Sequence, residues 1–156
     1  MIEADIPFFG ELRLEHLVLD FNGTLAEDGS LLPGVRETLS ALAEKLKVHV
    51  LTADTFGKVR HEMAGLPCEL IVLGSEEQAQ VKANYVERLG ASRVVCIGNG
   101  RNDKKMLESA ALGIMVIQKE GAASECVASS KVLSRSVQEA LSLLLNPMRL
   151  VATLRG

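Results

Sequence analysis

The sequence predicts an α/β fold of the doubly wound, Rossmann-like kind, with a mostly parallel sheet between helices on both faces, in three layers. Short β-branched runs alternate along the chain with longer segments of helical periodicity, which is typical of parallel strands joined by helices. Runs such as residues 94–98 (VVCIG) are apolar without interruption, which indicates strands buried on both faces. At 156 residues the chain has the size of one domain, so we expect a single domain over residues 1–156.

The strands are predicted from apolar and β-branched runs that are bounded by turn-forming residues. Residues 16–21 (HLVLDF) form the first strong run, and residues 10–15 before it either pair locally or lead into it. The other predicted strands span residues 47–54, 69–74, 93–100, 112–117 and 131–134.

Helices are predicted between these strands, where apolar side chains recur at helical spacing. The helix over residues 33–46 opens with proline at a first-turn position and has one stripe of aliphatic side chains. A helix over residues 56–65 ends at Gly65, and one over residues 76–89 ends at Gly90. The last two helices are expected over residues 102–110 and 136–145.

Composition excludes several classes of function. With a net charge of -3 and only 3% aromatic residues, the chain lacks the basic surface and stacking platforms of a nucleic-acid-binding protein, so we expect no specific nucleic acid binding. No apolar run approaches the roughly 18 residues that cross a bilayer, and residues 1–10 are acidic where a signal peptide is positive. We therefore expect no membrane association and a cytoplasmic location. The cysteines show no CxxC spacing and are interpreted as small apolar residues.

Polar side chains follow the predicted strands at the points where the strands end. Ligand sites of doubly wound sheets lie beyond the carboxyl ends of the strands, so these side chains are expected to converge on one rim. A lysine near the start of the helix over residues 76–89 could point to the same rim. Taken singly, each could be a turn residue, a helix cap or a solvated lysine. The candidates are Asp20, Asn22, Thr52, Asp54, Lys82, Asn99, Asn102 and Asp103.

The order of these residues along the chain resembles the order of motifs in a known protein family. The stretches DFNGT (20–24) and LTAD (51–54), then Lys82, then GNGRND (98–103) resemble the motifs of the haloacid dehalogenase-like superfamily of phosphohydrolases and phosphotransferases. Within it, the chain resembles the phosphorylation domain of P-type ATPases, whose signatures are of the form DKTGT and GDGxND. Because no transmembrane segment is predicted, the chain looks like a soluble, ATPase-like member.

The resemblance implies phosphoryl transfer through an aspartyl phosphate, with Mg²⁺ as cofactor. Asp20 would attack the phosphoryl group, Thr52 would hydrogen-bond its oxygens, and Lys82 would neutralise charge on both partners. Phosphoryl transfer asks a protein mainly for such positioning and neutralisation, and Mg²⁺ prefers hard oxygen ligands. The implied metal-binding residues are Asp20, Asn22 through its main-chain carbonyl, Asn99 and Asp103. The implied phosphate-binding or substrate-binding residues are Asn22, Gly23, Thr52, Ala53, Lys82 and Asn102.

Two residues depart from the family's pattern. Many phosphatases of this class have a second aspartate, the general acid and base, at the position of Asn22. Acid-base catalysis contributes about 10²- to 10⁴-fold, so breakdown of the phosphoenzyme is expected to be slow unless another group such as Asp54 substitutes. Asp54 could equally cap the following helix, as Thr24 could cap its turn. Asn99 stands where a carboxylate is usual, so weaker metal binding is expected.

The short lengths of chain between the motifs indicate how open the site is to substrates. Each is used up by a helix and a strand of the predicted sheet, which leaves no room for the cap domain that many relatives insert. An uncovered site suits a phosphorylated substrate that could be macromolecular, or a second subunit that closes the mouth. Residues 143–155 are rich in aliphatic side chains and either pack on the chain's own core or make a homo-oligomer contact.

Other functions are weighed against this one. The GNG of residues 98–100 follows a strand like a dinucleotide fingerprint, but Asp103 stands where the third small residue belongs. A phospho-receiver domain places its acidic residues in a different order, and residues 74–82 lack a complete P-loop. The three histidines suggest core or surface residues and no pair of metal ligands. A catalytically weakened protein that binds phosphate or Mg²⁺ and regulates a partner remains an alternative, favoured by Asn22 and Asn99.

Overall fold

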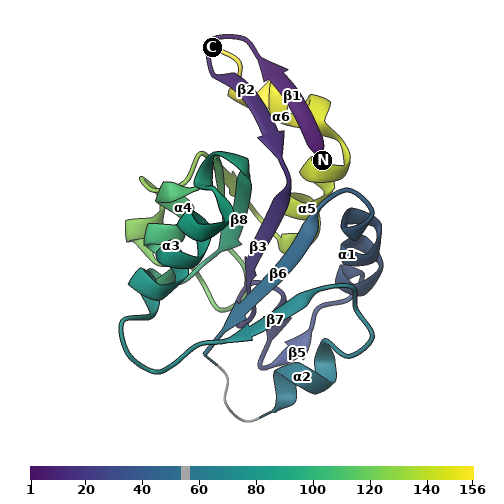
Figure 1. Cartoon of the computed structure of the whole chain (residues 1–156), viewed down its shortest axis with the longest axis vertical. Helices are drawn as coiled ribbons and strands as arrows, with labels where there is room; N and C mark the ends of the chain where they lie inside the picture. Colours follow the sequence, from purple (N-terminus) through teal and green to yellow (C-terminus); the bar gives the residue numbers. More distant parts are fainter. Residues whose placement is uncertain (54–56) are drawn as a thin grey trace.

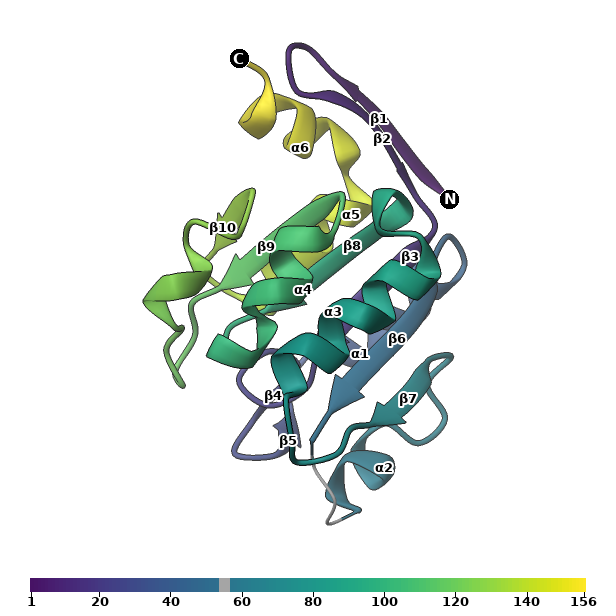
Figure 2. The same ribbon diagram turned by 60° about the vertical axis from the view of Figure 1, so that its left-hand side comes forward.

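The computed structural model describes residues 1–53 and 57–156, and its centre is a six-stranded parallel sheet. The strands are β3 (His16–Asp20), β6 (Lys47–Thr52), β7 (Glu69–Val72), β8 (Val94–Gly98), β9 (Leu112–Val116) and β10 (Val132–Ser134). They lie in the order β10–β9–β8–β3–β6–β7; Figure 1 labels β8, β3, β6 and β7, and Figure 2 labels all six. The chain therefore runs outward from β3 in one direction, returns, and continues from β8 in the other. This reversal of strand order beside β3 is the topological switch point of a doubly wound sheet.

Helices cover both faces of this sheet, as predicted. They are α1 (Val35–Ala43), α2 (Lys58–Glu62), α3 (Gln78–Leu89), α4 (Lys104–Ser109), α5 (Val137–Leu145) and α6 (Pro147–Leu154). Three short 3₁₀ turns are η1 (Ala91–Arg93), η2 (Arg101–Asp103) and η3 (Ser124–Cys126). Figure 2 shows α3 and α4 lying together along one face.

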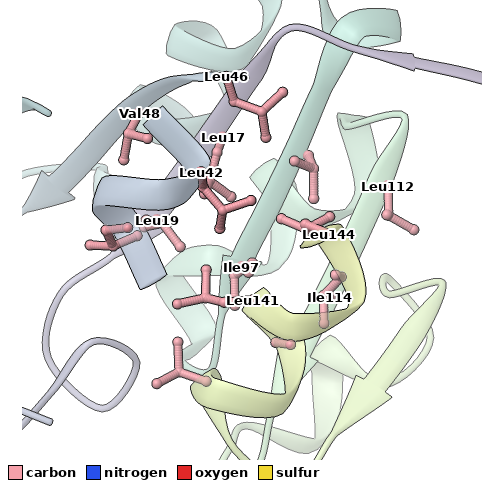
Figure 3. Packing of buried hydrophobic residues seen from close by; sticks show 14 of the residues in the cluster. Leu17, Leu19, Leu42, Leu46, Val48, Ile97, Leu112, Ile114, Leu141 and Leu144 are labelled. Atoms are coloured by element: carbon pink, nitrogen blue, oxygen red, sulfur yellow. The ribbon is translucent and has the colours of Figure 1, made fainter. Parts of the chain in front are cut away.

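Two hydrophobic cores lie on opposite faces because successive strand residues point to opposite sides. Leu17 and Leu19 of β3 pack with the buried side chains of α1 and α5, as Figure 3 shows. Val18, between them, packs in a separate cluster with residues of α3 and α4. In each of β3, β8 and β9 all five residues are buried, so the predicted three-layer arrangement is confirmed.

The helices are shorter than the sequence pattern suggested. The predicted helix over residues 33–46 is helical over Val35–Ala43, although Leu46 still packs in the core. Its start is set by Gly34, which has a φ of 78° that is costly for residues with a side chain. The predicted helix over residues 56–65 is helical over Lys58–Glu62 within the described residues.

From the sequence, local pairing of residues 10–15 was one of two alternatives, and no strand was predicted before them. Strands β1 (Ile2–Ile6) and β2 (Gly10–Leu14) form an antiparallel pair outside the main sheet, so residues 10–14 pair locally. The apolar C-terminal segment folds against it, since α6 contacts β1 (Figure 1). Leu150 of α6 is fully buried within the core cluster. The C-terminal segment therefore packs on the chain's own core.

A small hairpin follows the first main strand. Strands β4 (Ala26–Glu27) and β5 (Ser30–Leu31) pair antiparallel beyond the end of β3 and were not predicted. In the described residues, only this hairpin and α1 separate β3 from β6. Between β6 and β8 the described elements are α2, β7, α3 and η1. The described part of these intervals thus contains no additional folded unit of the size of a cap.

His16 and His49 are buried and form a pair that the sequence did not reveal, whereas His61 is exposed. Nδ1 of His16 lies 3.0 Å from Nε2 of His49, and Nδ1 of His49 lies 2.9 Å from the hydroxyl of Tyr85. Burial is the main cause that lowers the pKa of both histidines. This chain of hydrogen bonds ties β3 and β6 to α3.

Candidate active site

Three strand ends bring the predicted residues to one rim of the sheet. β3 ends at Asp20, which is in register with Leu51 of β6, one residue before Thr52. On the other side, β3 pairs with β8, which ends at Gly98 immediately before Asn99. Because all three strands are parallel, their carboxyl ends lie at the same edge. The first condition for a shared site, neighbouring strand ends, is met.

A single ammonium group joins the two carboxylates. Nζ of Lys82 lies 2.6 Å from Oδ1 of Asp20 and 2.6 Å from Oδ1 of Asp103. Lys82 and Asp103 are fully buried, and Asp20 is 7% exposed. Buried charges are stable only when they are paired and hydrogen-bonded, and here one cation serves two anions. The three side chains come from positions far apart in the sequence and form one cluster.

Helix α3 carries Lys82 to this cluster. Lys82, Ala83 and Val86 are its buried residues, and they recur at the spacing of one helical face. The aliphatic stem of a lysine can lie along apolar surface while its charged end reaches a polar site. The packing of α3 against η2 and α4 therefore places the ammonium beside the loop that contains Asp103.

Backbone N–H groups orient Asp103. Its Oδ2 accepts hydrogen bonds from the backbone N–H groups of Asn99 and Gly100, at 3.0 and 2.9 Å. Its other oxygen remains directed to Lys82. A Cβ at Gly98 would lie 2.6 Å from Cγ of Asp103, so this close arrangement requires glycine at position 98.

The turn after Asp20 is tied to the loop after β8. The hydroxyl of Thr24 lies 3.4 Å from Oδ2 of Asp20 and 3.3 Å from Oδ1 of Asn99, so its single proton can be shared between them. Nδ2 of Asn99 donates to the carbonyl oxygen of Gly121 at 3.0 Å. Thr24 thus links two parts of the site, where the sequence had suggested a turn cap. A carboxylate at position 99 could not make the bond to Gly121.

With both carboxylates ionised, the cluster of Asp20, Lys82 and Asp103 has a net negative charge. Burial and the neighbouring Asp103 carboxylate raise the pKa of Asp20 to about 7, and the Lys82 ammonium offsets only part of this effect. Burial disfavours the charged form of Lys82, but the two carboxylates outweigh it and raise the pKa of this lysine. Two anions share one cation, so the site favours a further positive charge.

The remaining predicted residues occupy different places. Thr52 is buried at the end of β6. Ala53, directly after it, and the side chain of Asn22 are exposed. Nδ2 of Asn102 donates to Oε1 of Gln78 at 3.0 Å and so points toward α3. Asp54, the suggested substitute acid or cap, lies outside the described residues.

Gln118 is a contact residue of this site that the sequence analysis missed. Its Nε2 donates to the carbonyl oxygens of Gly23 and Thr24 at 3.0 and 2.9 Å. Its Oε1 accepts from the backbone N–H of Val137, the first residue of α5, at 2.8 Å. One amide therefore joins the turn after Asp20 to a helix more than a hundred residues later. No local pattern around Gln118 marks this role, because its partners are all backbone atoms of distant segments.

The donor set suits a hard divalent cation. The carboxylates of Asp20 and Asp103 meet at one ammonium, and the peptide at Asn22 lies two residues beyond Asp20 in the same turn. Oxygen donors of this kind match Mg²⁺ better than softer metals. In the described part of the chain, no group of three or more histidine, cysteine, aspartate or glutamate residues could hold a metal ion. A metal here would therefore depend on two carboxylates, with carbonyl, amide or water oxygens completing its shell.

Comparison with other sequences finds relatives that are matched over most of their own length. Uncharacterized protein MJ0073 of Methanocaldococcus jannaschii is 43% identical over 86 residues, which are 53% of this chain and 90% of that protein. Uncharacterized protein MJ0072 of the same organism is 46% identical over 39 residues, 25% of this chain and 89% of that protein. No protein-family model matches the chain.

Comparison with solved structures identifies the fold. The 3-deoxy-D-manno-octulosonate 8-phosphate phosphatase of Moraxella catarrhalis, in complex with magnesium, phosphate and the sugar acid, has a TM-score of 0.67 at 19% identity. That match covers 90% of this chain and 92% of the other. The corresponding phosphatase of Yersinia pestis has a TM-score of 0.70 at 14% identity, covering 96% and 95%. A protein predicted to be a HAD family hydrolase, from Streptomyces avermitilis, has a TM-score of 0.70 at 18% identity and 87% coverage of both chains. The chain therefore has the haloacid dehalogenase-like fold.

Within the described residues, no helix has both the length and the apolar character that a membrane crossing requires.

Proposed function

The chain belongs to the same family as protein MJ0073 of Methanocaldococcus jannaschii, and we propose that it is a Mg²⁺-dependent phosphohydrolase or phosphotransferase. One observation carries this proposal: Lys82 bridges Asp20 and Asp103 at 2.6 Å in a buried cluster at the switch point of the sheet. The likeness to structures of phosphatases, one of them with magnesium and phosphate, supports it.

Asp20 is the nucleophile of the proposed reaction. An oxygen of its carboxylate forms a bond to phosphorus while the bond from phosphorus to the leaving-group oxygen breaks, giving an aspartyl phosphate. Water then attacks the phosphorus, inorganic phosphate departs, and the carboxylate of Asp20 is restored. In a phosphotransferase, a hydroxyl of an acceptor takes the place of water. Lys82 reduces the repulsion between the carboxylate and the anionic phosphoryl group.

Asp20, Asp103 and the main-chain carbonyl of Asn22 would hold Mg²⁺. The bound ion would supply positive charge, which offsets the excess negative charge of the two buried carboxylates and of the phosphoryl group. Asn99 is a weaker candidate ligand, because its amide is already engaged by Thr24 and Gly121. Thr52 and the backbone around Gly23 are proposed to bind the phosphoryl oxygens.

Asn22 is the reason why we expect slow breakdown of the phosphoenzyme. An amide can neither protonate the leaving group nor accept the proton of the attacking water, so solvent or another group must do both. We infer that Asp20 is phosphorylated more readily by activated donors and that the phosphoenzyme breaks down slowly. This is the behaviour of the P-type ATPase-like subgroup, in which we place the chain on its DFNGT and GNGRND motifs.

Turnover assays test the proposal. The protein is incubated with acetyl phosphate or p-nitrophenyl phosphate, with Mg²⁺ or with a chelator, and inorganic phosphate is measured. We expect release by the wild type with Mg²⁺, and its loss without Mg²⁺ and in Asp20→Ala. Equal rates for wild type and Asp20→Ala would contradict the assignment of the nucleophile.

The alternative is a regulatory protein that binds phosphate or Mg²⁺ on the same fold without efficient turnover. Asn22 and the engaged amide of Asn99 are the observations that favour it. It predicts that Mg²⁺ and phosphate raise the melting temperature although a range of phosphate donors gives neither product nor phosphoenzyme. The mouth of the proposed site would admit small or macromolecular phosphorylated partners in either case.

A further inference from the structure

A groove opens beside the carboxylate cluster. It has a volume of about 710 Å³, which lies in the range of small-molecule sites. One wall consists of the turn before α3 and the first residues of this helix, and the other consists of η2, the start of α4 and Glu125 of η3. Asn102 is the one lining residue to which the family resemblance gave a role, and the proposed phosphoryl transfer uses none of the others.

The groove shares a loop with the proposed phosphoryl site. Asn102 lines it and immediately precedes Asp103, and its amide donates to Gln78 on the opposite wall at 3.0 Å. From Asp103 the contacts run through Lys82 to Asp20, each at 2.6 Å. The loop that contains Asn102 and Asp103 thus borders both the groove and the carboxylate cluster.

The lining of the groove is rich in cations. Arg101, Lys104 and Lys105 fall within five consecutive residues, although the whole chain has a net charge of -3. Against these three positive charges stand two lining carboxylates, those of Glu77 and Glu125. The groove therefore has a net positive charge in an acidic protein.

The cations are only weakly committed to partners in the protein. Nε of Arg101 lies 3.3 Å from Glu125, but the two side chains are 81% and 45% exposed, so this ion pair contributes little. Nζ of Lys105 donates to the neutral amide oxygen of Gln80 at 2.7 Å. Both groups can thus turn to an anionic ligand at small cost.

We propose that this groove binds the leaving group of a small phosphate ester, and that the leaving group carries a second anionic group such as a carboxylate. The inference rests on the proposed phosphoryl transfer at Asp20. Arg101, Lys104 and Lys105 neutralise the second anion. The amides of Gln78, Gln80 and Asn102 provide hydrogen bonds to hydroxyl groups of the same molecule. The groove thereby selects polar substrates that carry a second anionic group over phosphate esters that carry none.

Pairs of substrates that differ by one carboxylate test this selectivity. The pairs are 3-phosphoglycerate with glycerol 3-phosphate, and phosphoserine with phosphoethanolamine. At low salt, we expect wild-type kcat/KM to favour the carboxylate member of at least one pair by about fivefold or more, the effect of a partly exposed charge contact. In Arg101→Gln/Lys104→Gln this preference should fall toward one. In Lys45→Gln/Arg155→Gln, which removes the same charge from distant exposed positions, it should persist.

A binding measurement separates failure of this inference from failure of the proposed function. Dissociation constants for the same pairs are measured by calorimetry in Asp20→Asn, with and without the Arg101→Gln/Lys104→Gln changes. If no phosphate ester is hydrolysed but the carboxylate member binds more tightly and loses that advantage in the groove variant, the proposed function fails and the groove assignment stands. If neither pair shows a preference in turnover or in binding, or if the preference survives in the groove variant, the inference is overturned.

Discussion

Gly23 and Asn99 approach each other so closely that a Cβ at position 23 would lie 2.4 Å from Nδ2 of Asn99. Gly23 also has a φ of 77°, which a residue with a side chain adopts only at a cost. The turn after Asp20 and the loop after β8 thus fit together only because position 23 has no side chain. Through Thr24 the same loops share a hydroxyl proton, so the geometry of the Asp20 carboxylate depends on both.

Gly23→Ala is therefore expected to destabilise the protein by more than its backbone conformation alone would explain. The left-handed φ costs about 1–2 kcal/mol, and displacement of the Asn99 amide adds to this. Urea unfolding measures the difference. Gly34→Ala is the matched control, because Gly34 has a φ of 78° and nothing within 4 Å of the added Cβ. Equal losses in the two variants would show that the contact with Asn99 carries no energy.

Lys82→Met removes the only cation in contact with Asp20 and Asp103 among the described residues. It leaves two buried carboxylates without their partner, and losses of this kind cost about 3–5 kcal/mol. We expect a large fall in the free energy of unfolding at pH 8, partly recovered by Mg²⁺. Lys45→Met, at an exposed position, should change stability by less than about 0.5 kcal/mol. A Lys82→Met protein as stable as the control would contradict the described charge balance.

The raised pKa of Asp20 gives a stability prediction with a definite sign in the absence of Mg²⁺. Between the ordinary value of 3.8 and about 7, the unfolded chain loses the proton of Asp20 while the folded protein keeps it. The contribution of Asp20 to stability is thus fully present below pH 4 and is lost as the pH rises to about 7, with a slope of up to about 1.4 kcal/mol per pH unit. Asp20→Asn should remove this slope, so the variant should gain melting temperature relative to wild type as the pH rises from 4 to 8. Parallel melting curves for the two proteins across this range would refute the prediction.

Gln118 is expected to act on the proposed reaction by positioning the turn after Asp20. Gln118→Glu replaces the amide that donates to the carbonyls of Gly23 and Thr24 by a carboxylate that repels them. We expect kcat with acetyl phosphate to fall by about tenfold or more, the effect of a small misplacement of reacting groups. Gln138→Glu is the matched control, because this partly exposed glutamine donates to the carbonyl of Pro33 and not to the turn after Asp20. If both variants lose activity in proportion to their loss of stability, Gln118 has no positioning role.

Asn22→Asp should restore the missing acid and base. The side chain at position 22 is exposed in the turn beyond Asp20, so a carboxyl group can be accommodated there. We expect breakdown of the phosphoenzyme to accelerate by about 10²-fold, at the lower end of general acid-base effects. Single-turnover decay of the phosphoenzyme measures this step directly. A variant no faster than the parent would show that another group already performs the proton transfers.

The sequence predicted the sheet, its layers and the rim because these follow from local patterns. Apolar runs such as 94–98 and the polar residues that end them identify strands and their carboxyl ends without knowledge of tertiary contacts. The motifs also indicated that Asp20, Lys82 and Asp103 belong together. The two carboxylates meet at one buried ammonium, and the catalytic roles of the three residues are proposals.

What the sequence could not predict depends on contacts between distant segments. Gln118 and Gly121 contribute to the site through bonds to loops about a hundred and about twenty residues away, and no periodicity encodes such pairs. The β1–β2 hairpin was only half expected, because it lies outside the sheet and is stabilised by α6 from the other end of the chain. The pair of His16 and His49 escaped notice because it depends on the alignment of two strands.

Trapping the phosphoenzyme tests the central claim most directly. The protein is mixed with Mg²⁺ and acetyl phosphate that carries a radiolabelled phosphoryl group, quenched in acid, and counted for bound label. A second portion is reduced with borohydride, which releases the phosphate and converts the modified aspartate to homoserine, and the homoserine position is identified by digestion and mass spectrometry. The proposed function predicts one acid-stable, alkali-labile acyl phosphate per chain at Asp20, absent from Asp20→Ala and diminished in Lys82→Met. A phosphoryl group on any other residue, or equal labelling of wild type and Asp20→Ala, would contradict it.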